Sequence, residues 1–207
     1  MSQDMNQPVN SPQAILNRDD PKAPVLMAVT GASGSIYAFK FMEILSRERV
    51  DVHLVVSDTG KMVIQHELGR EKAEQLLDMA ARIYPVDAIG SAPASGSSKW
   101  RAMVIIPCTM GTLGAITSGH SSNLIHRAAD CFLKERRPLI AVVRETPLNR
   151  IHIENMLRLH DAGGIIFPAM PAFYQKPVTL EDIAEYLASR IADFLGVPVQ
   201  IPRWHGI

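Results

Sequence analysis

The stretch KERRPLIAVVRETPL, residues 134–148, decides the fold class. Its centre, residues 139–143, is a continuous apolar run bounded by Pro138 and ended by Arg144 and Glu145. A short run of this kind indicates a strand buried on both faces of a parallel sheet. Ligands of such sheets bind beyond the carboxyl ends of the strands, where a guanidinium suits a phosphate and a carboxylate suits proton transfer. The alternative interpretation is a solvated loop that carries two charges.

Outward from this strand, apolar runs alternate with segments of helical spacing. Further strands are predicted at residues 25–29, 51–56, 102–106 and 164–167. Helices are predicted at residues 36–45, 61–68, 72–84, 124–135, 151–162 and 180–195, the last after a capping pattern at Thr179. This alternation predicts an α/β protein: a single-domain, three-layer fold, Rossmann-like or flavodoxin-like, with a parallel sheet flanked by helices. Residues 85–99, rich in Gly, Ser and Pro, form a long irregular segment that we expect to be functional or mobile.

Length and composition restrict the class of protein. A chain of 207 residues fits one domain with a full-sized core. Its 21 Lys and Arg balance its 21 Asp and Glu, so no net charge favours nucleic acid or a membrane surface as a partner. The two cysteines, Cys108 and Cys131, are too few for a disulfide framework or a zinc ribbon, so we expect a soluble, cytoplasmic protein. Residues 1–24 have neither the basic start nor the apolar centre of a secretory signal and are predicted to be a disordered tail.

A glycine-containing turn, TGASGS at residues 30–35, follows the first predicted strand and opens the first helix. Glycines allow close approach of a ligand, and unpaired amides at a helix start suit a phosphate. The turn lacks the third glycine of the dinucleotide fingerprint, and Ser57 ends the second strand where an NAD site would have an acidic residue. The turn therefore predicts an anion or mononucleotide site, with a purely structural turn as the alternative.

The third predicted strand ends in PCTMGT, residues 107–112, which adds two hydroxyls and a run of amides to the same sheet edge. Cys108 could act as a nucleophile, but no base lies beside it in the sequence. A small buried side chain is the more common role of such a cysteine.

Several charged or hydroxyl side chains lie farther along the chain. Arg127 and Lys134 fall on one face of a predicted helix, where a solvated face paired with Asp130 is the alternative. Tyr174 ends a segment stiffened by prolines, and Arg190 lies within the last helix. The histidines show no paired ligand spacing, so no metal is predicted.

Taken together, these segments resemble the UbiX-type flavin prenyltransferase family. The resemblance covers residues 25–204 and rests on TGASGSIY (30–37), HLVVS (53–57), PASGS (93–97), PCTMGTL (107–113), NLIHRAAD (123–130), KERRPL (134–139), RETPLNRIHIENML (144–157) and PAMPAFY (168–174). It implies that residues 25–207 form a flavin prenyltransferase domain.

The family's activity is what this resemblance implies for the chain. Members transfer a dimethylallyl group from dimethylallyl monophosphate to N5 of reduced FMN, close a ring at C6, and need no metal. The product, prenylated FMN, serves a UbiD-type decarboxylase. Members usually form homododecamers whose sites are shared between subunits.

The resemblance also assigns roles by position. For FMN it implies Gly31, Ala32, Ser33, Ser57, Thr109, Met110, Gly111, Thr112 and Arg144. For the prenyl phosphate it implies Tyr174, Arg190, Arg127 and Lys134. Glu145 would manage the proton released at C6, and Lys134 and Ser33 would also take part in catalysis.

The chain departs from the family at three places, and other functions remain as alternatives. Thr109 stands where many members have Ser, which keeps the hydroxyl. Asp58 follows Ser57 where Lys is frequent, and Ile89, Gly90 and Ser91 stand near the place of a tryptophan that flanks the prenyl group. One alternative is a flavin-dependent cysteine decarboxylase on the same fold, although the asparagines that it requires are missing from residues 107–112 and 168–174. The others are a hydroxybenzoate decarboxylase and a flavin carrier without catalysis.

Overall fold

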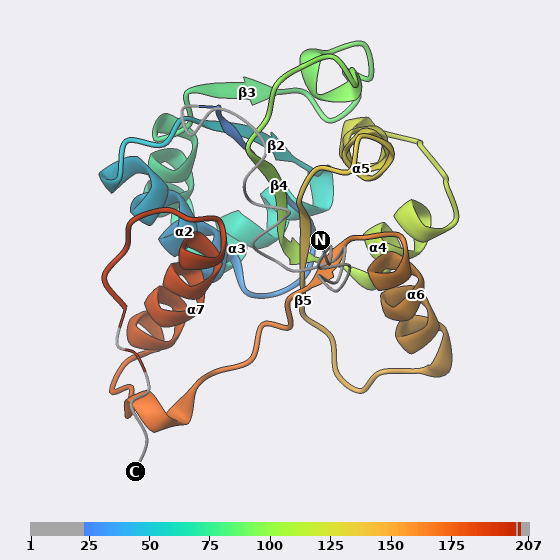
Figure 1. Ribbon diagram of the computed structural model, residues 1–207. Helices are drawn as coiled ribbons and strands as arrows, with labels where there is room; N and C mark the ends of the chain where they lie inside the picture. Colours follow the sequence, from blue (N-terminus) through green and yellow to red (C-terminus); the bar gives the residue numbers. More distant parts are fainter. Residues whose placement is uncertain (1–22, 202, 204–207) are drawn as a thin grey trace, which may run out of the picture.

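The computed structural model describes residues 23–201 and 203, and it consists of one parallel sheet between two helical layers (Figure 1). The strands are β1 (Val25–Val29), β2 (Val52–Val56), β3 (Arg82–Tyr84), β4 (Ala102–Cys108), β5 (Leu139–Val143) and β6 (Ile165–Ile166). All neighbours pair in parallel, in the order β3-β2-β1-β4-β5-β6. The predicted single-domain α/β fold is confirmed, and this strand order is the Rossmann one rather than the flavodoxin one.

Each face of the sheet is covered by its own set of helices. One face carries α2 (Ser35–Arg47), α3 (Asp58–Asp78) and α7 (Leu180–Phe194), and the other carries α4 (Met110–Thr117), α5 (Leu124–Lys134) and α6 (Arg150–Asp161). In β1, Val25, Met27 and Val29 pack toward α2 and α7, whereas Leu26 and Ala28 pack toward α4 and α5. The central strands are therefore apolar at every position, because both of their faces are buried.

Two short elements were not predicted. The helix predicted over residues 72–84 is wrong at its end, because residues 82–84 form strand β3 at the sheet edge. Three residues are too few to show an alternating pattern. Helix α4 was missed because it has only eight residues, two of them glycines, and its start depends on a cap from Thr109.

The chain around Ala23 already belongs to the folded body. Ala23 is 6% exposed, and the Pro24 carbonyl accepts a hydrogen bond of 3.0 Å from the Arg101 amide. The predicted tail therefore does not extend to residue 24, and its first 22 residues lie outside the described part of the chain.

The long irregular segment 85–99 is anchored along α5. It contains one short 3₁₀ helix, η1 (Ala92–Ala94); the Ala94 carbonyl accepts from the Cys131 thiol and the Gly96 carbonyl from Arg137, at 3.0 and 2.7 Å. Of the helices that the structure describes, none combines the length and apolar character needed to cross a bilayer.

Candidate active site

The candidate site lies at the carboxyl edge of the sheet between β1 and β4. These strands are neighbours, but the chain leaves β1 for α2 on one face and β4 for α4 on the other. In open α/β sheets, ligands bind where connections diverge in this way. The buried Thr30 joins the two loops, because its hydroxyl donates to the Pro107 carbonyl (2.7 Å) and accepts from the Thr109 amide (2.9 Å).

The turn before α2 lies directly against the start of α3. A Cβ atom on Gly31 would stand 2.6 Å from Thr59 Oγ1, so no side chain fits there. Gly34 has a φ of 116°, a conformation that favours glycine. The Ser57 hydroxyl caps α3 by accepting from the Gly60 amide at 3.0 Å. The structure therefore brings the predicted flavin ligands Gly31, Ala32, Ser33 and Ser57 together.

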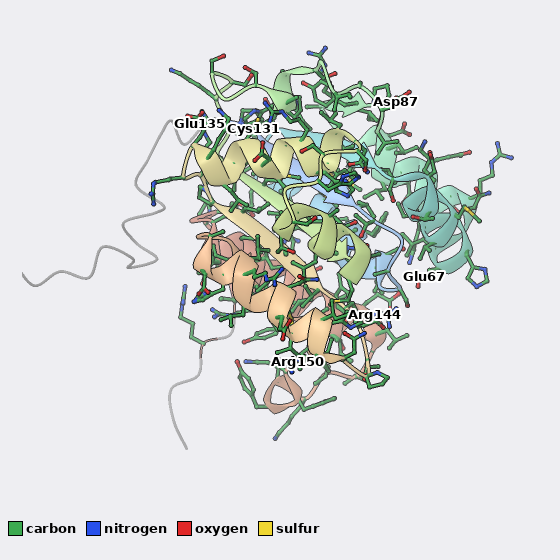
Figure 2. The ribbon with its side chains drawn as sticks, turned by 90° about the vertical axis from the view of Figure 1, so that its right-hand side faces the viewer. Glu67, Asp87, Cys131, Glu135, Arg144 and Arg150 are labelled. Carbon is green, nitrogen blue, oxygen red and sulfur yellow. The ribbon has the colours of Figure 1, made fainter. Side chains whose placement is uncertain are left out.

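The turn at Ser33 is held from two sides (Figure 2). Arg144, which follows β5, donates from Nε to the Ser33 carbonyl at 2.9 Å. Glu67 of α3 accepts from the Gly34 amide at 3.0 Å and from the Ser35 amide at 2.7 Å. The first helical turn of α2 therefore has a carboxylate on its amides, in a position where the sequence predicts a phosphate.

Glu67 is the site residue that the sequence reasoning missed. Burial by itself would raise the pKa of Glu67, but hydrogen bonds from the Ser33 side chain and from the Gly34 and Ser35 amides outweigh it and hold the pKa below its ordinary value. Glu67 lies in the first half of α3, two residues before the interruption of this helix at Gly69, where φ is 76° and ψ 172°. The sequence predicts separate helices on either side of this glycine, but it gives no signal that Glu67 contacts the start of α2.

The loop after β4 contributes hydroxyls and amides. The Thr109 hydroxyl caps α4 by accepting from the Thr112 amide at 3.1 Å and donates to the Thr112 hydroxyl at 2.9 Å. The side chain of Met110 is buried in the core, so its amide is the group that it can offer to a ligand. Like α2 and α3, α4 begins at this edge of the sheet, so three positive helix ends converge there.

Glu145 lies exposed next to Arg144, and its Oε1 accepts from the Thr146 amide at 3.1 Å. Tyr37, in the first turn of α2, is close enough to Arg144 for their charges to interact. Burial raises the pKa of Tyr37, and the nearby guanidinium partly offsets the increase.

Arg127 and Lys134 lie in α5 and are both ion-paired within that region. Arg127 pairs with Asp130 at 2.6 Å and Lys134 with Glu135 at 2.6 Å. Lys134 stands over the turn of the PASGS motif, since a Cβ atom on Gly96 would be 2.6 Å from its Nζ. Helix α5 ends before the amino end of β5, whereas Arg144 follows its carboxyl end. Figure 2 shows Glu135 and Arg144 far from each other accordingly.

Tyr174 and Arg190 form the second part of the predicted prenyl-phosphate site. Tyr174 lies in the 3₁₀ helix η2 (Phe173–Gln175), beside α7, and Arg190 is in α7 and contacts Asp193 at 3.4 Å. Because α7 and α5 cover opposite faces of the sheet, one chain does not unite this pair with Arg127 and Lys134.

Cys108 behaves as the sequence predicts. Cys108 is fully buried, and burial raises the pKa of its thiol to about 12, so it is a core side chain and not a nucleophile. Within the described residues, no group of three or more His, Cys, Asp or Glu side chains could hold a metal ion.

A Rossmann-type sheet with hydroxyls, amides and an arginine at its switch point suits a nucleotide, and the family model described as Flavoprotein matches residues 13–201. The flavin prenyltransferase UbiX of Methanothermobacter thermautotrophicus is 45% identical over 183 residues, covering 88% of this chain and 95% of the relative. The chain therefore belongs to the UbiX-type flavin prenyltransferases.

Solved structures agree with this assignment. AnUbiX (PadA1), in complex with FMN and dimethylallyl pyrophosphate, has a TM-score of 0.85 and 36% identity, covering 90% of this chain and 99% of that one. The dodecameric FMN-dependent UbiX-like decarboxylase from Escherichia coli O157:H7 has a TM-score of 0.84 and 36% identity over 89% of this chain and 100% of that one.

The cysteine decarboxylases are more distant. Peptidyl-cysteine decarboxylase EpiD is 14% identical with a TM-score of 0.60, covering 83% of this chain and 97% of that one. This likeness extends to the fold alone.

Proposed function

We propose that this chain transfers a dimethylallyl group from dimethylallyl monophosphate to N5 and C6 of reduced FMN and releases prenylated FMN. The observation that carries the proposal is the convergence of three helix starts with Arg144 and Glu145 at the β1–β4 edge. The reaction is inferred from family membership, and its location is inferred from the residues at this edge of the sheet.

The residues at this edge fit a flavin nucleotide. Gly31 and Gly60 leave no room for a Cβ atom, so the loops after β1 and β2 are packed closely and present backbone rather than side chains. Amides of residues 31–33 and 109–112, the hydroxyls of Ser57, Thr109 and Thr112, and the guanidinium of Arg144 would hold FMN. Because Glu67 already accepts from two amides of α2, the starts of α3 and α4 are the better places for the FMN phosphate.

Bound FMN supplies the nucleophilic nitrogen and carbon of the reaction. The chain's own contribution is to stabilise the charge that appears on the departing phosphate when its allylic carbon–oxygen bond breaks. Tyr174, Arg190, Arg127 and Lys134 would surround that phosphate. Removing one preorganised donor of this kind typically costs about 3 to 4 kcal/mol of transition-state stabilisation.

Two carboxylates have different tasks in the proposal. Glu145 is exposed at the edge and would accept the proton released from C6. Glu67, whose pKa is lowered by several hydrogen bonds, is a weak base and would instead hold Ser33, a proposed catalytic residue, in place.

The phosphate site would be completed by a second copy of the chain. Arg127 and Lys134 lie across the sheet from Tyr174 and Arg190, so one copy would supply each pair. The segment after β6 exposes large apolar side chains suited to such a contact: Met170 (70%), Phe173 (71%) and Val178 (91%). The dodecameric relative supports a homododecamer with shared sites.

A UbiD-type decarboxylase would receive the product, and the reaction would take place in the cytoplasm. Both described cysteines are free thiols, which suits a reducing compartment.

The test is the mass of the flavin after anaerobic incubation with reduced FMN and dimethylallyl monophosphate. We expect a flavin heavier by one C5 unit. Bound FMN of unchanged mass would refute the proposal and indicate a flavin carrier without catalysis.

A further inference from the structure

Tyr186 of α7 lies in direct contact with Tyr174. Their hydroxyls are hydrogen-bonded to each other, and their rings meet edge to face with centroids 6.0 Å apart and an interplanar angle of 85°. Tyr174 is 50% exposed, whereas Tyr186 is half-buried and contacts η2 from α7. The more buried phenol therefore supports the more accessible one.

The two phenols share one neighbouring cation. Tyr186 and Arg190 are four residues apart on α7, so they lie on the same face of the helix. The Arg190 charge acts on both phenols: it adds to the lowering of the pKa of Tyr174 and offsets part of the increase in the pKa of Tyr186. Tyr174, Tyr186 and Arg190 therefore form one cluster around the proposed phosphate ligands.

The two carboxylates beside Tyr186 already have other partners. The cavity next to it is lined by Lys176, Asp182 and Glu185. The Asp182 carboxylate accepts from the Val178 and Thr179 amides, both at 2.9 Å. Glu185 pairs with Arg47 and Lys40 at 3.5 and 3.8 Å. Arg190 is the cation whose charge affects the pKa of both phenols.

The environments of the two phenols shift their pKa values in opposite directions. The hydrogen bond with Tyr186 is the largest cause that lowers the pKa of Tyr174, and a second comes from Gln175. Burial, followed by the bond to Tyr174, raises the pKa of Tyr186. Either hydroxyl can be the donor of this hydrogen bond, and donation by the more buried Tyr186 directs the hydrogen of Tyr174 to another acceptor.

We propose that Tyr186 is a positioning residue for the prenyl-phosphate site: its hydroxyl fixes the rotation of the Tyr174 hydroxyl so that Tyr174 donates to a phosphate oxygen of the substrate. This inference rests on the proposed function, since it takes Tyr174 as a ligand of dimethylallyl monophosphate. Tyr186 itself does not touch the substrate.

The test compares Tyr186→Phe with wild type, and Tyr84→Phe is the matched control because the Tyr84 hydroxyl contacts His53 on the other face of the sheet. Calorimetry on protein loaded with oxidised FMN measures the binding of dimethylallyl monophosphate without turnover. Loss of one orienting hydrogen bond should weaken that binding about fivefold in Tyr186→Phe. The FMN affinity of Tyr186→Phe should stay unchanged. Tyr84→Phe should bind FMN and dimethylallyl monophosphate as wild type does.

A double mutant shows whether Tyr186 acts through Tyr174. In the Tyr174→Phe background, Tyr186→Phe should have no further effect on binding. Absorbance titration of the phenols gives a second readout: Tyr174 should ionise below the ordinary range in wild type and return toward it in Tyr186→Phe.

Different results would refute the positioning role of Tyr186 and the proposed transferase function. Equal losses of FMN and prenyl-phosphate binding, additive effects in the double mutant, or wild-type binding by Tyr186→Phe would each overturn the positioning role. Binding of dimethylallyl monophosphate that depends on Tyr186, without any prenylated flavin from wild type, would refute the transferase proposal and leave the positioning role standing. If wild type binds no dimethylallyl monophosphate, both the positioning role of Tyr186 and the proposed transferase function are wrong.

Discussion

Ser33 shows how single residues prepare the site before a ligand arrives. Its carbonyl accepts from Arg144, its side chain contacts Glu67, and the next two amides donate to the same carboxylate. A cation and an anion from different elements thus fix one turn from opposite sides. Groups that are already oriented need little reorganisation during the reaction, which is the main source of electrostatic catalysis.

Glu145→Gln tests the proton acceptor. The amide cannot take up a proton, so formation of prenylated FMN should fall by about a hundredfold or more, while FMN affinity is retained. The flavin mass, measured anaerobically, reports the formation of prenylated FMN, and fluorescence titration reports FMN affinity. Glu43→Gln, whose carboxylate pairs with Lys40 on α2, is the control. Unchanged product formation by Glu145→Gln would exclude the proposed role.

Glu67→Gln tests the carboxylate at the start of α2. Because the folded-state pKa of Glu67 is lowered, its contribution to stability is present above its unfolded pKa and is lost as pH falls through the folded value. The variant should therefore be less stable than wild type at pH 7, by about 0.5 to 1 kcal/mol, and the difference should shrink below about pH 4.

Urea unfolding at the two pH values measures this difference. Glu71→Gln, in the second half of the same helix, serves as the control. A difference that stays constant with pH would show that the charge of Glu67 is irrelevant to its role.

Elements whose residues are buried on all sides were predictable from the sequence, and elements defined by a few contacts were not. Strands β1 and β5 have the predicted bounds because both faces of each are covered. Strand β3 has one partner strand and two exposed residues, so its sequence carries no clear pattern. The loops of the candidate site were predictable because they follow strands. Glu67 was not, since its role depends on contacts with amides more than 30 residues away in the sequence.

Gly69→Ala tests the interruption of α3. The backbone at Gly69 lies in a region that is nearly restricted to glycine, although no atom within 4 Å would obstruct a Cβ. The substitution should therefore cost about 1 to 3 kcal/mol through backbone strain alone. The midpoint of thermal unfolding should fall by roughly 2 to 4 °C for each kcal/mol.

Gly90→Ala is the matched control, because Gly90 also has open space around it and no positive φ. Equal stability of the two variants would contradict a special conformation at Gly69. A loss of thermal stability confined to Gly69→Ala, together with weaker FMN binding by that variant, would link the bend in α3 to the proposed FMN site.

The whole molecule presents its proposed substrate ligands on two faces. Arg127 and Lys134 extend from α5, and Tyr174 and Arg190 lie along α7, with the sheet between them. No side-chain rearrangement can join groups that a six-stranded sheet separates. Assembly is the simplest way to bring them to one phosphate, which makes the number and arrangement of subunits part of the chemistry.

Mixing two inactive variants tests this arrangement. Lys134→Ala and Arg190→Ala should each lose activity as pure proteins, and Arg190→Ala should need more prenyl phosphate while binding FMN normally. When both chains are co-expressed with different tags and the mixed assembly is isolated, a site that takes Lys134 from one chain and Arg190 from the next is intact in about a quarter of cases. Activity should therefore return to about a quarter of the wild-type value.

Lys134→Ala mixed with Arg127→Ala is the matched control. Both residues extend from the same helix, so every site built by that mixture lacks one of them and activity should stay low. If the complete set of ligands came from a single chain, neither mixture would regain activity. Activity that returns only in the mixture of Lys134→Ala with Arg190→Ala is therefore expected only when α5 of one copy and α7 of a neighbouring copy meet at the substrate.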